Sequence, residues 1–170
     1  IVGEDFPKEH MKFLESRGID LSGVETRKGA KTFHWKGEYG LDLNDAKTLQ
    51  TDLNVLLQFN PILPEDFRKA DFLFLGNLDP QIQLDVLAQF KKRPGLVVAD
   101  TMNHWINDKR EKVLEVVKAA DICLMNDIEA RLLFKTPNLK KAAGEILALD
   151  SKIAIIKKGE HGAVAFSTKS

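Results

Sequence analysis

The chain has 170 residues, of which 44% are hydrophobic and 29% charged, a composition typical of a folded protein and too apolar for intrinsic disorder. Lys plus Arg and Asp plus Glu both number 25, and this balance argues against nucleic-acid or anionic-membrane partners bound through a basic field. The single cysteine, Cys123, excludes an internal disulfide and a cysteine-rich zinc site, and no apolar run approaches the roughly 20 residues of a membrane span, so we expect a cytoplasmic protein.

The first third of the chain predicts a helix followed by β structure. Pro7 near the start and Gly18 just past the end are typical punctuation for a helix over residues 7–17. From residue 24 to about residue 59, alternating polar and bulky residues followed by glycines indicate a small β insertion. The stretch 49–57 also fits a helical face, and we assign it to strand or coil.

From residue 61 the pattern becomes regular. The predicted strands are residues 72–75, 96–99, 122–125 and 153–156, and the predicted helices cover 80–92, 108–119, the region around 130–133, and 139–149. Wholly apolar runs of four residues are typical of strands buried on both faces, so they predict a mostly parallel, doubly wound α/β sheet in three αβα layers. We expect a partial α/β core, residues 1–23 and 60–170, and a β lid, residues 24–59.

Polar residues follow each predicted strand, at the edge where open α/β sheets bind their ligands. In chain order they are Asn77, Asp100 with Asn103, Asn126 with Glu129, and Lys157 with Gly159 and Gly162. Carboxylate and amide oxygens suit Mg²⁺ and its waters, whereas lysines and helix N-termini suit phosphate. This combination points to nucleotide chemistry.

Each of these features also has a purely structural interpretation. Asn126 and Glu129 fit a helix capping box, and Asp100 could simply end its strand and cap the next turn. Lys157 and Lys158 could be solvated charges at the end of a strand, and Gly159 and Gly162 favour a tight hairpin. No single feature distinguishes the structural from the functional interpretation, so the functional interpretation depends on the order of the motifs along the chain.

That order resembles the ribokinase/PfkB carbohydrate kinase family over nearly the whole chain. The segments that carry the resemblance are residues 2–6 (glycine-x-aspartate), 13–20 (the end of the first helix), 31–33 (start of the family's β lid), 72–77 (the strand that ends near the sugar), 100–105 (aspartate-x-asparagine), 126–129 (asparagine-x-x-glutamate) and 157–162 (lysine-x-glycine-x-x-glycine). The aspartate-x-asparagine segment departs from the family in spacing, and no arginine follows it.

The resemblance implies ATP- and Mg²⁺-dependent transfer of a phosphoryl group to a hydroxyl of a sugar or nucleoside. It implies Asn126 and Glu129 as magnesium and phosphate residues, Lys157, Gly159 and Gly162 on the nucleotide side, and Asn77, Asp100 and Asn103 on the substrate side. The family's paired glycines would precede Ile1, and its Gly-Ala-Gly-Asp segment with the catalytic base would follow Ser170. We therefore expect a piece of a longer kinase that is inactive alone, and we assign no catalytic base.

The alternative function is a non-catalytic α/β domain that kept the ligand crevice without the chemistry. A dinucleotide-dependent dehydrogenase is disfavoured because no G-x-G-x-x-G follows a predicted strand. Exposed edges and an apolar face predict that the lid covers the crevice or pairs with a second lid in a homodimer. Phe33, Trp35 and Tyr39 suit either a ligand-facing strip or an insertion that packs on itself.

Overall fold

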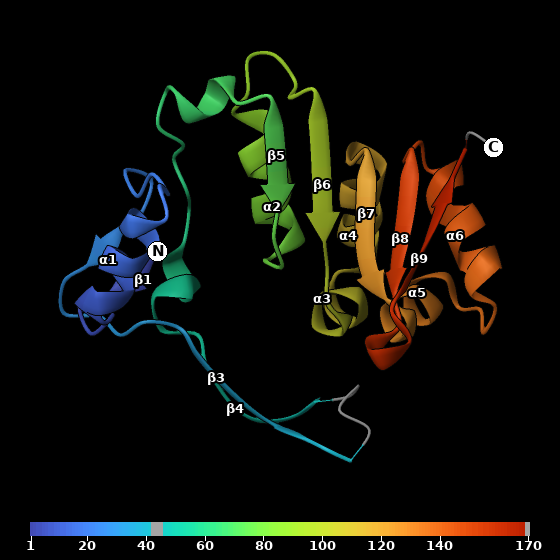
Figure 1. Ribbon diagram of the computed structural model, residues 1–170, viewed down its shortest axis with the longest axis horizontal. Helices are drawn as coiled ribbons and strands as arrows, with labels where there is room; N and C mark the ends of the chain where they lie inside the picture. Colours follow the sequence, from blue (N-terminus) through green and yellow to red (C-terminus); the bar gives the residue numbers. More distant parts are fainter. Residues whose placement is uncertain (42–45, 169–170) are drawn as a thin grey trace. The chain divides into compact units, whose positions relative to one another are not determined.

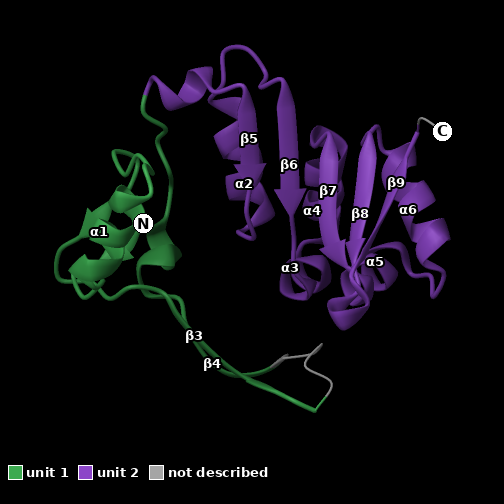
Figure 2. Cartoon of the chain, in the orientation of Figure 1, with its two compact units in different colours: residues 1–64 green, residues 65–170 purple. Residues whose placement is uncertain are grey.

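The computed structural model describes residues 1–41 and 46–168, in two compact units, Ile1–Pro64 and Glu65–Ser170 (Figures 1 and 2). The predicted division into a lid at 24–59 and a core at 1–23 and 60–170 stays a prediction. Residues 42–45 of that lid lie outside the described residues. Among the helices that the structure describes, none is long and apolar enough to cross a membrane.

In unit 1, a short parallel sheet lies at the start of the chain. Strand β1 (Val2–Gly3) pairs with β2 (Thr26–Arg27), and helix α1 (Lys8–Ser16) connects them. The predicted punctuation is present, because Pro7 precedes α1 and Gly18 follows it with φ at +75°. Gly3 leaves no room for a side chain, since an added Cβ would collide with the backbone carbonyl oxygen of Ala30.

The rest of unit 1 contains the β structure that the alternating pattern predicts. Strands β3 (His34–Tyr39) and β4 (Ala46–Asp52) form an antiparallel hairpin, and the 3₁₀ helix η1 (Asn54–Gln58) follows. The ambiguous stretch 49–57 is therefore divided between β4 and η1. Trp35 is 39% exposed and Tyr39 56% exposed, so the hairpin does not enclose these aromatic rings.

Unit 2 contains the predicted sheet. Its strands are β5 (Phe72–Leu75), β6 (Leu96–Asp100), β7 (Ile122–Asn126), β8 (Ile153–Lys157) and β9 (Ala163–Ser167), in that order across the sheet. Strands β5 to β8 run parallel, and β9 returns antiparallel to β8. The prediction of an α/β fold with a mostly parallel sheet is confirmed.

Two predicted helices differ from those observed. The helices of unit 2 are α2 (Pro80–Ala88), α3 (Asn103–Asp108), α4 (Arg110–Ala119), α5 (Asp127–Phe134) and α6 (Leu139–Ala148), with the 3₁₀ turns η2 (Phe67–Lys69) and η3 (Gly159–His161). The helix expected to reach residue 92 ends at Ala88, where the Gln89 and Phe90 N–H groups form tighter i→i−3 bonds to the carbonyl oxygens of Val86 and Leu87. The helix expected from residue 108 begins at Arg110, because Lys109 has non-helical backbone angles that separate it from α3.

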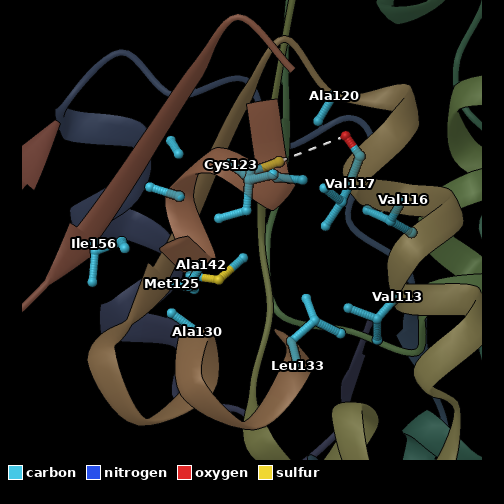
Figure 3. Packing of buried hydrophobic residues seen from close by; sticks show 14 of the residues in the cluster. Val113, Val116, Val117, Ala120, Cys123, Met125, Ala130, Leu133, Ala142 and Ile156 are labelled. Atoms are coloured by element: carbon cyan, nitrogen blue, oxygen red, sulfur yellow. Dashed lines mark hydrogen bonds between the residues drawn. The ribbon is translucent and has the colours of Figure 1, made fainter. Parts of the chain in front are cut away.

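The core lies between one face of this sheet and the helices (Figure 3). Alternate strand residues point into it, among them Val97, Cys123, Met125, Ala154 and Ile156, where they meet Val113, Val117, Leu133, Ala142 and Ile146 from the helices. The intervening residues Val98, Leu124 and Ile155 are half-buried and lie on the opposite face. The continuous apolar runs thus reflect two apolar faces, and the described helices of unit 2 contribute to the core on one of them.

Cys123 is a structural residue of this core. It is 1% exposed, and its sulfur lies 3.7 Å from the carbonyl oxygen of Val117 (Figure 3). The sulfur also lies 3.2 Å from Ser151 Oγ. Burial raises the pKa of the Cys123 thiol to about 11. At neutral pH the side chain is therefore a protonated thiol rather than a nucleophile.

Candidate functional site

Strands β5 to β8 run in the same direction and end at a common edge of unit 2, the edge toward which their arrowheads point in Figure 1. The predicted polar residues lie at or just beyond this edge. Asp100, Asn126 and Lys157 are the last residues of β6, β7 and β8. In the sheet register, Asn126 pairs with Lys157 and Asp100 pairs with Leu124. We call this edge the carboxyl-edge site.

An ion pair crosses the site. The Lys157 ammonium lies 3.2 Å from Asp100 Oδ1 and 3.5 Å from Oδ2, so it spans from β8 to β6 over the intervening strand β7. The Lys157 side chain is 46% exposed and that of Asp100 is 23% exposed. Because the pair is open to solvent, it contributes at most about 1 kcal/mol to stability. Its charges remain accessible to a ligand.

Glu129 is the buried acid of the site, with 6% of its surface exposed. Its Oε2 accepts from the Asn126 backbone N–H at 2.7 Å, its Oε1 accepts from Asn126 Nδ2 at 2.9 Å, and its own N–H donates to Asn126 Oδ1 at 2.8 Å. The capping box is therefore formed at the start of α5. The structural interpretation of this pair is correct, whatever further role it has.

The same carboxylate interacts with the ion pair. Burial raises the pKa of Glu129, while the Asn126 backbone N–H and then the Lys157 ammonium act in the opposite direction. The carboxylates of Asp100 and Asp127 add to the rise in pKa. Glu129 is thus both a helix cap and a member of the charge cluster formed with Asp100 and Lys157.

Asn77 lies beyond β5, where it contacts two residues of the segment 100–105. Its Oδ1 accepts from Trp105 Nε1 at 3.1 Å, and its Nδ2 donates to Met102 Sδ at 3.0 Å. Trp105 also lies beneath the Lys109 ammonium, which is 5.7 Å from the ring centroid. Asn103, another of the three predicted substrate residues, is exposed at the first position of α3. Asn77, Met102 and Trp105 thus form one hydrogen-bonded cluster.

Gly159 and Gly162 form the turn after β8. Both have positive φ, +56° and +78°, and the Lys158 N–H donates to the Gly162 carbonyl oxygen at 2.7 Å. A Cβ on Gly162 would meet nothing within 4 Å, so its backbone conformation rather than crowding favours glycine there. Both glycines form their backbone hydrogen bonds within this turn. They lie near Lys157 because the turn directly follows that residue in the chain.

Gln83 of α2 is a site residue that sequence reasoning missed. It is 4% exposed, and its Nε2 donates to the carbonyl oxygens of Gly76 at 2.8 Å and Asp100 at 3.0 Å. A third, longer bond reaches the Leu75 carbonyl oxygen at 3.3 Å. The side chain therefore ties the ends of β5 and β6 together. The sequence did contain a sign of this role. Gln83 is a polar residue on the helix face that it shares with Pro80, three residues before it, and Leu87, four residues after it.

The residues present fit Mg²⁺ held mainly through water and phosphate. In residues 1–41 and 46–168, no group of three or more His, Cys, Asp or Glu side chains is arranged to hold a metal ion. Mg²⁺ commonly takes one or two protein carboxylates and keeps waters and substrate phosphates as its other ligands. Glu129, hydrogen-bonded to Asn126, could supply such a carboxylate, and Lys157 a charge for phosphate.

Comparisons with known proteins all point to kinases of one family. A family model described as pfkB family carbohydrate kinase matches residues 1–170. A cytidine kinase from Thermococcus kodakarensis is 28% identical over 167 residues, which is 97% of this chain and 59% of that kinase. The chain thus spans about three fifths of the curated relative that it matches.

Solved structures show the same fold. A protein described as a ribokinase II from E. coli, in complex with ATP and Mg²⁺, has a TM-score of 0.79 at 17% identity, covering 99% of this chain and 58% of that one. A Burkholderia thailandensis nucleoside kinase in complex with inosine has a TM-score of 0.76 at 15% identity, covering 99% and 54%. At such identities the likeness shows the fold alone.

Proposed function

This chain belongs to the pfkB family of carbohydrate kinases, as the order of its motifs predicts, and on that premise we propose that it is part of an ATP- and Mg²⁺-dependent kinase acting on a hydroxyl of a sugar or nucleoside. The observation that most directly supports this function is the ion pair of Asp100 and Lys157, which interacts with the buried Glu129. Phosphoryl transfer depends mostly on positioning and charge neutralisation, which are what this cluster offers.

On the nucleotide side, Asn126 and Glu129 would organise Mg²⁺ and its waters near the phosphates. A buried carboxylate with fixed hydrogen-bond partners suits that role because it is already oriented before the ligand binds. Lys157 would neutralise phosphate charge. Gly159 and Gly162 would line the nucleotide through the turn that follows β8.

On the acceptor side, Asn77, Asp100 and Asn103 would contact the sugar. Trp105 holds the Asn77 amide by its indole N–H, which leaves that amide oriented. The cytidine kinase relative and the inosine-bound neighbour make nucleosides the first acceptors to test. A cytoplasmic location and pairing of two β3–β4 hairpins in a homodimer are part of the same proposal.

We further propose that residues 1–170 do not catalyse phosphoryl transfer alone. The chain spans 59% of the cytidine kinase, and the family's Gly-Ala-Gly-Asp segment does not occur in its sequence. Losing one donor of an anion hole typically costs about 10²–10³ in rate. A chain without that segment would lack both the anion hole and the base.

The experiment measures ADP formation by a full-length protein that contains residues 1–170, with cytidine, inosine or ribose as acceptor. We expect acceptor-dependent ADP formation that EDTA abolishes. Lys157→Met should lower kcat/KM about 100-fold or more, whereas the matched variant Lys141→Met, at an exposed position of α6, should stay within about twofold. Nucleoside binding without ADP formation would instead favour a non-catalytic binding domain.

A further inference from the structure

A cavity lies at the opposite edge of the unit 2 sheet, at the ends of β5 and β6 away from their arrowheads in Figure 1. Its volume is about 700 Å³, within the range of small-molecule sites. Two segments form it, the chain leading into β5 and the loop between α2 and β6. The Leu96 N–H donates to the Asp71 carbonyl oxygen at 3.1 Å and holds these two segments together. We call it the amino-edge cavity.

The lining of the amino-edge cavity is strongly basic. Its cationic residues are Arg68, Lys69, Lys91, Lys92 and Arg93. Against these five cations stand two carboxylates, Glu65 and Asp71, which leaves an excess of three positive charges among the described lining residues. One of the five, Lys69, is paired at 2.9 Å with Asp66, which does not line the cavity. The whole chain has no net charge. The cavity therefore concentrates positive charge that the rest of the sequence balances.

The cations differ in how they are held. The Arg93 guanidinium lies 2.8 Å from the buried Asp121 carboxylate and donates to the Ala119 carbonyl oxygen at 2.9 Å, so it forms a fixed wall. Lys91 and Lys92 are exposed, and neither forms an ion pair with a residue that the structure describes. Their two neighbouring positive charges therefore repel each other, whereas that of Arg93 is paired with Asp121.

A structural explanation accounts for only part of this arrangement. Lys91 and Lys92 follow the C-terminal end of α2, where cations interact favourably with the helix dipole. That effect falls off within the last turn of a helix. It does not explain why Arg68 and Lys69, from a separate segment, line the same cavity.

We propose that the amino-edge cavity binds a small molecule carrying two or more phosphate groups. Cations contributed by two segments suit a ligand with more than one anionic group, because each phosphate oxygen can receive its own charge-assisted hydrogen bond. Arginine and lysine together provide a planar donor fork and compact point charges. The site is separate from the carboxyl-edge site, since β5 and β6 run between the two edges.

The test is a calorimetric titration of the full chain with inorganic pyrophosphate at low ionic strength. The probe variant is Lys91→Gln/Lys92→Gln, and the matched control is Lys140→Gln/Lys141→Gln, which removes two exposed lysines from α6. We expect the probe variant to weaken pyrophosphate binding by on the order of tenfold or more, and the control to change it less than twofold.

A third variant, Lys157→Gln, reports binding at the carboxyl edge. A loss confined to Lys157→Gln would assign pyrophosphate to that edge and overturn the proposal. Equal losses in both double variants would show unspecific attraction to surface charge and would overturn it too. So would the absence of binding to the unmodified chain. Unchanged urea unfolding of the probe variant would exclude a folding defect as the cause of its loss.

Discussion

The Lys157 ammonium reaches the Asp100 carboxylate at 3.2 Å, although the two residues are 57 positions apart in the sequence. The contact exists because β6, β7 and β8 are neighbouring parallel strands that end together. Both charges also act on Glu129, in opposite directions. The three side chains therefore form one electrostatic unit.

The first prediction tests that unit. Asp100→Asn should lower the pKa of Glu129, because it removes a neighbouring negative charge and leaves Lys157 unpaired. Lys157→Gln should raise the pKa of Glu129 for the converse reason. NMR titration of the Glu129 side-chain carboxyl measures both shifts, and Lys140→Gln on α6 should produce none. Shifts of the same sign in the two variants would contradict the coupling.

The second prediction concerns stability and pH. Burial raises the pKa of Glu129 in the folded state above its ordinary value of 4.5. The stability that Glu129 contributes is then fully present at pH values below its pKa in the unfolded chain. It is lost as pH rises through its pKa in the folded chain. The unfolding free energy of the unmodified chain should therefore rise relative to that of Glu129→Gln as pH falls from 7 toward 4. Glu145→Gln, an exposed control on α6, should show no such trend.

The third prediction concerns Asp121, which is 4% exposed and contacts Arg93 at 2.8 Å and Lys152 at 2.7 Å. Burial alone would raise the pKa of Asp121, but hydrogen bonds from Lys152, the Val97 N–H and Arg93 outweigh it and hold the pKa below its ordinary value of 3.8. Asp121→Asn should destabilise the fold at pH 7 by about 1–3 kcal/mol.

The pH dependence of that effect has the opposite sign to that of Glu129. Because the pKa of Asp121 is lower in the folded chain, its carboxylate stabilises the fold at pH values above its pKa in the unfolded chain. This stabilisation is lost as pH falls through the pKa of Asp121 in the folded chain. The gap between the unmodified chain and Asp121→Asn should shrink below about pH 3.8. Asp150→Asn, at an exposed position, is the control. A gap that is constant with pH would show that Asp121 contributes through its shape and not its charge.

The fourth prediction concerns Gln83. Gln83→Leu keeps most of the side-chain volume and removes the donor shared by the carbonyl oxygens of Leu75, Gly76 and Asp100. We expect the free energy of unfolding to fall by about 1–3 kcal/mol in urea titrations. Gln81→Leu, on an exposed position of the same helix, should change it by less than about 0.5 kcal/mol. Equal effects would mean that Gln83 does not tie the strand ends.

Much of unit 2 was predictable because its strands are short, apolar and separated by amphipathic helices. Parallel strands must end at one edge, so Asp100, Asn126 and Lys157 could be placed near one another without coordinates. The capping box was predictable as well, because its donors and acceptors are three residues apart. These inferences rest on periodicity and local spacing.

The remaining features depend on contacts between distant segments. The role of Gln83 follows from where α2 packs against the ends of β5 and β6, whereas the local pattern shows only that Gln83 is a polar residue at a core position. Asp121 similarly meets Arg93 and Lys152 only in the folded chain. Helix α3 was missed because six residues are too few to show a helical period, and only the backbone at Lys109 shows where α4 begins.

The most direct test of the proposed function is the turnover of Glu129→Gln at saturating Mg²⁺, in a full-length protein that contains residues 1–170. If Glu129 acts on Mg²⁺ and phosphate, turnover should fall about 100-fold or more, while the free energy of unfolding at pH 7 changes by less than about 1 kcal/mol. Turnover equal to that of the unmodified protein would show that Glu129 only caps α5 and would contradict the proposed role of the carboxyl-edge site.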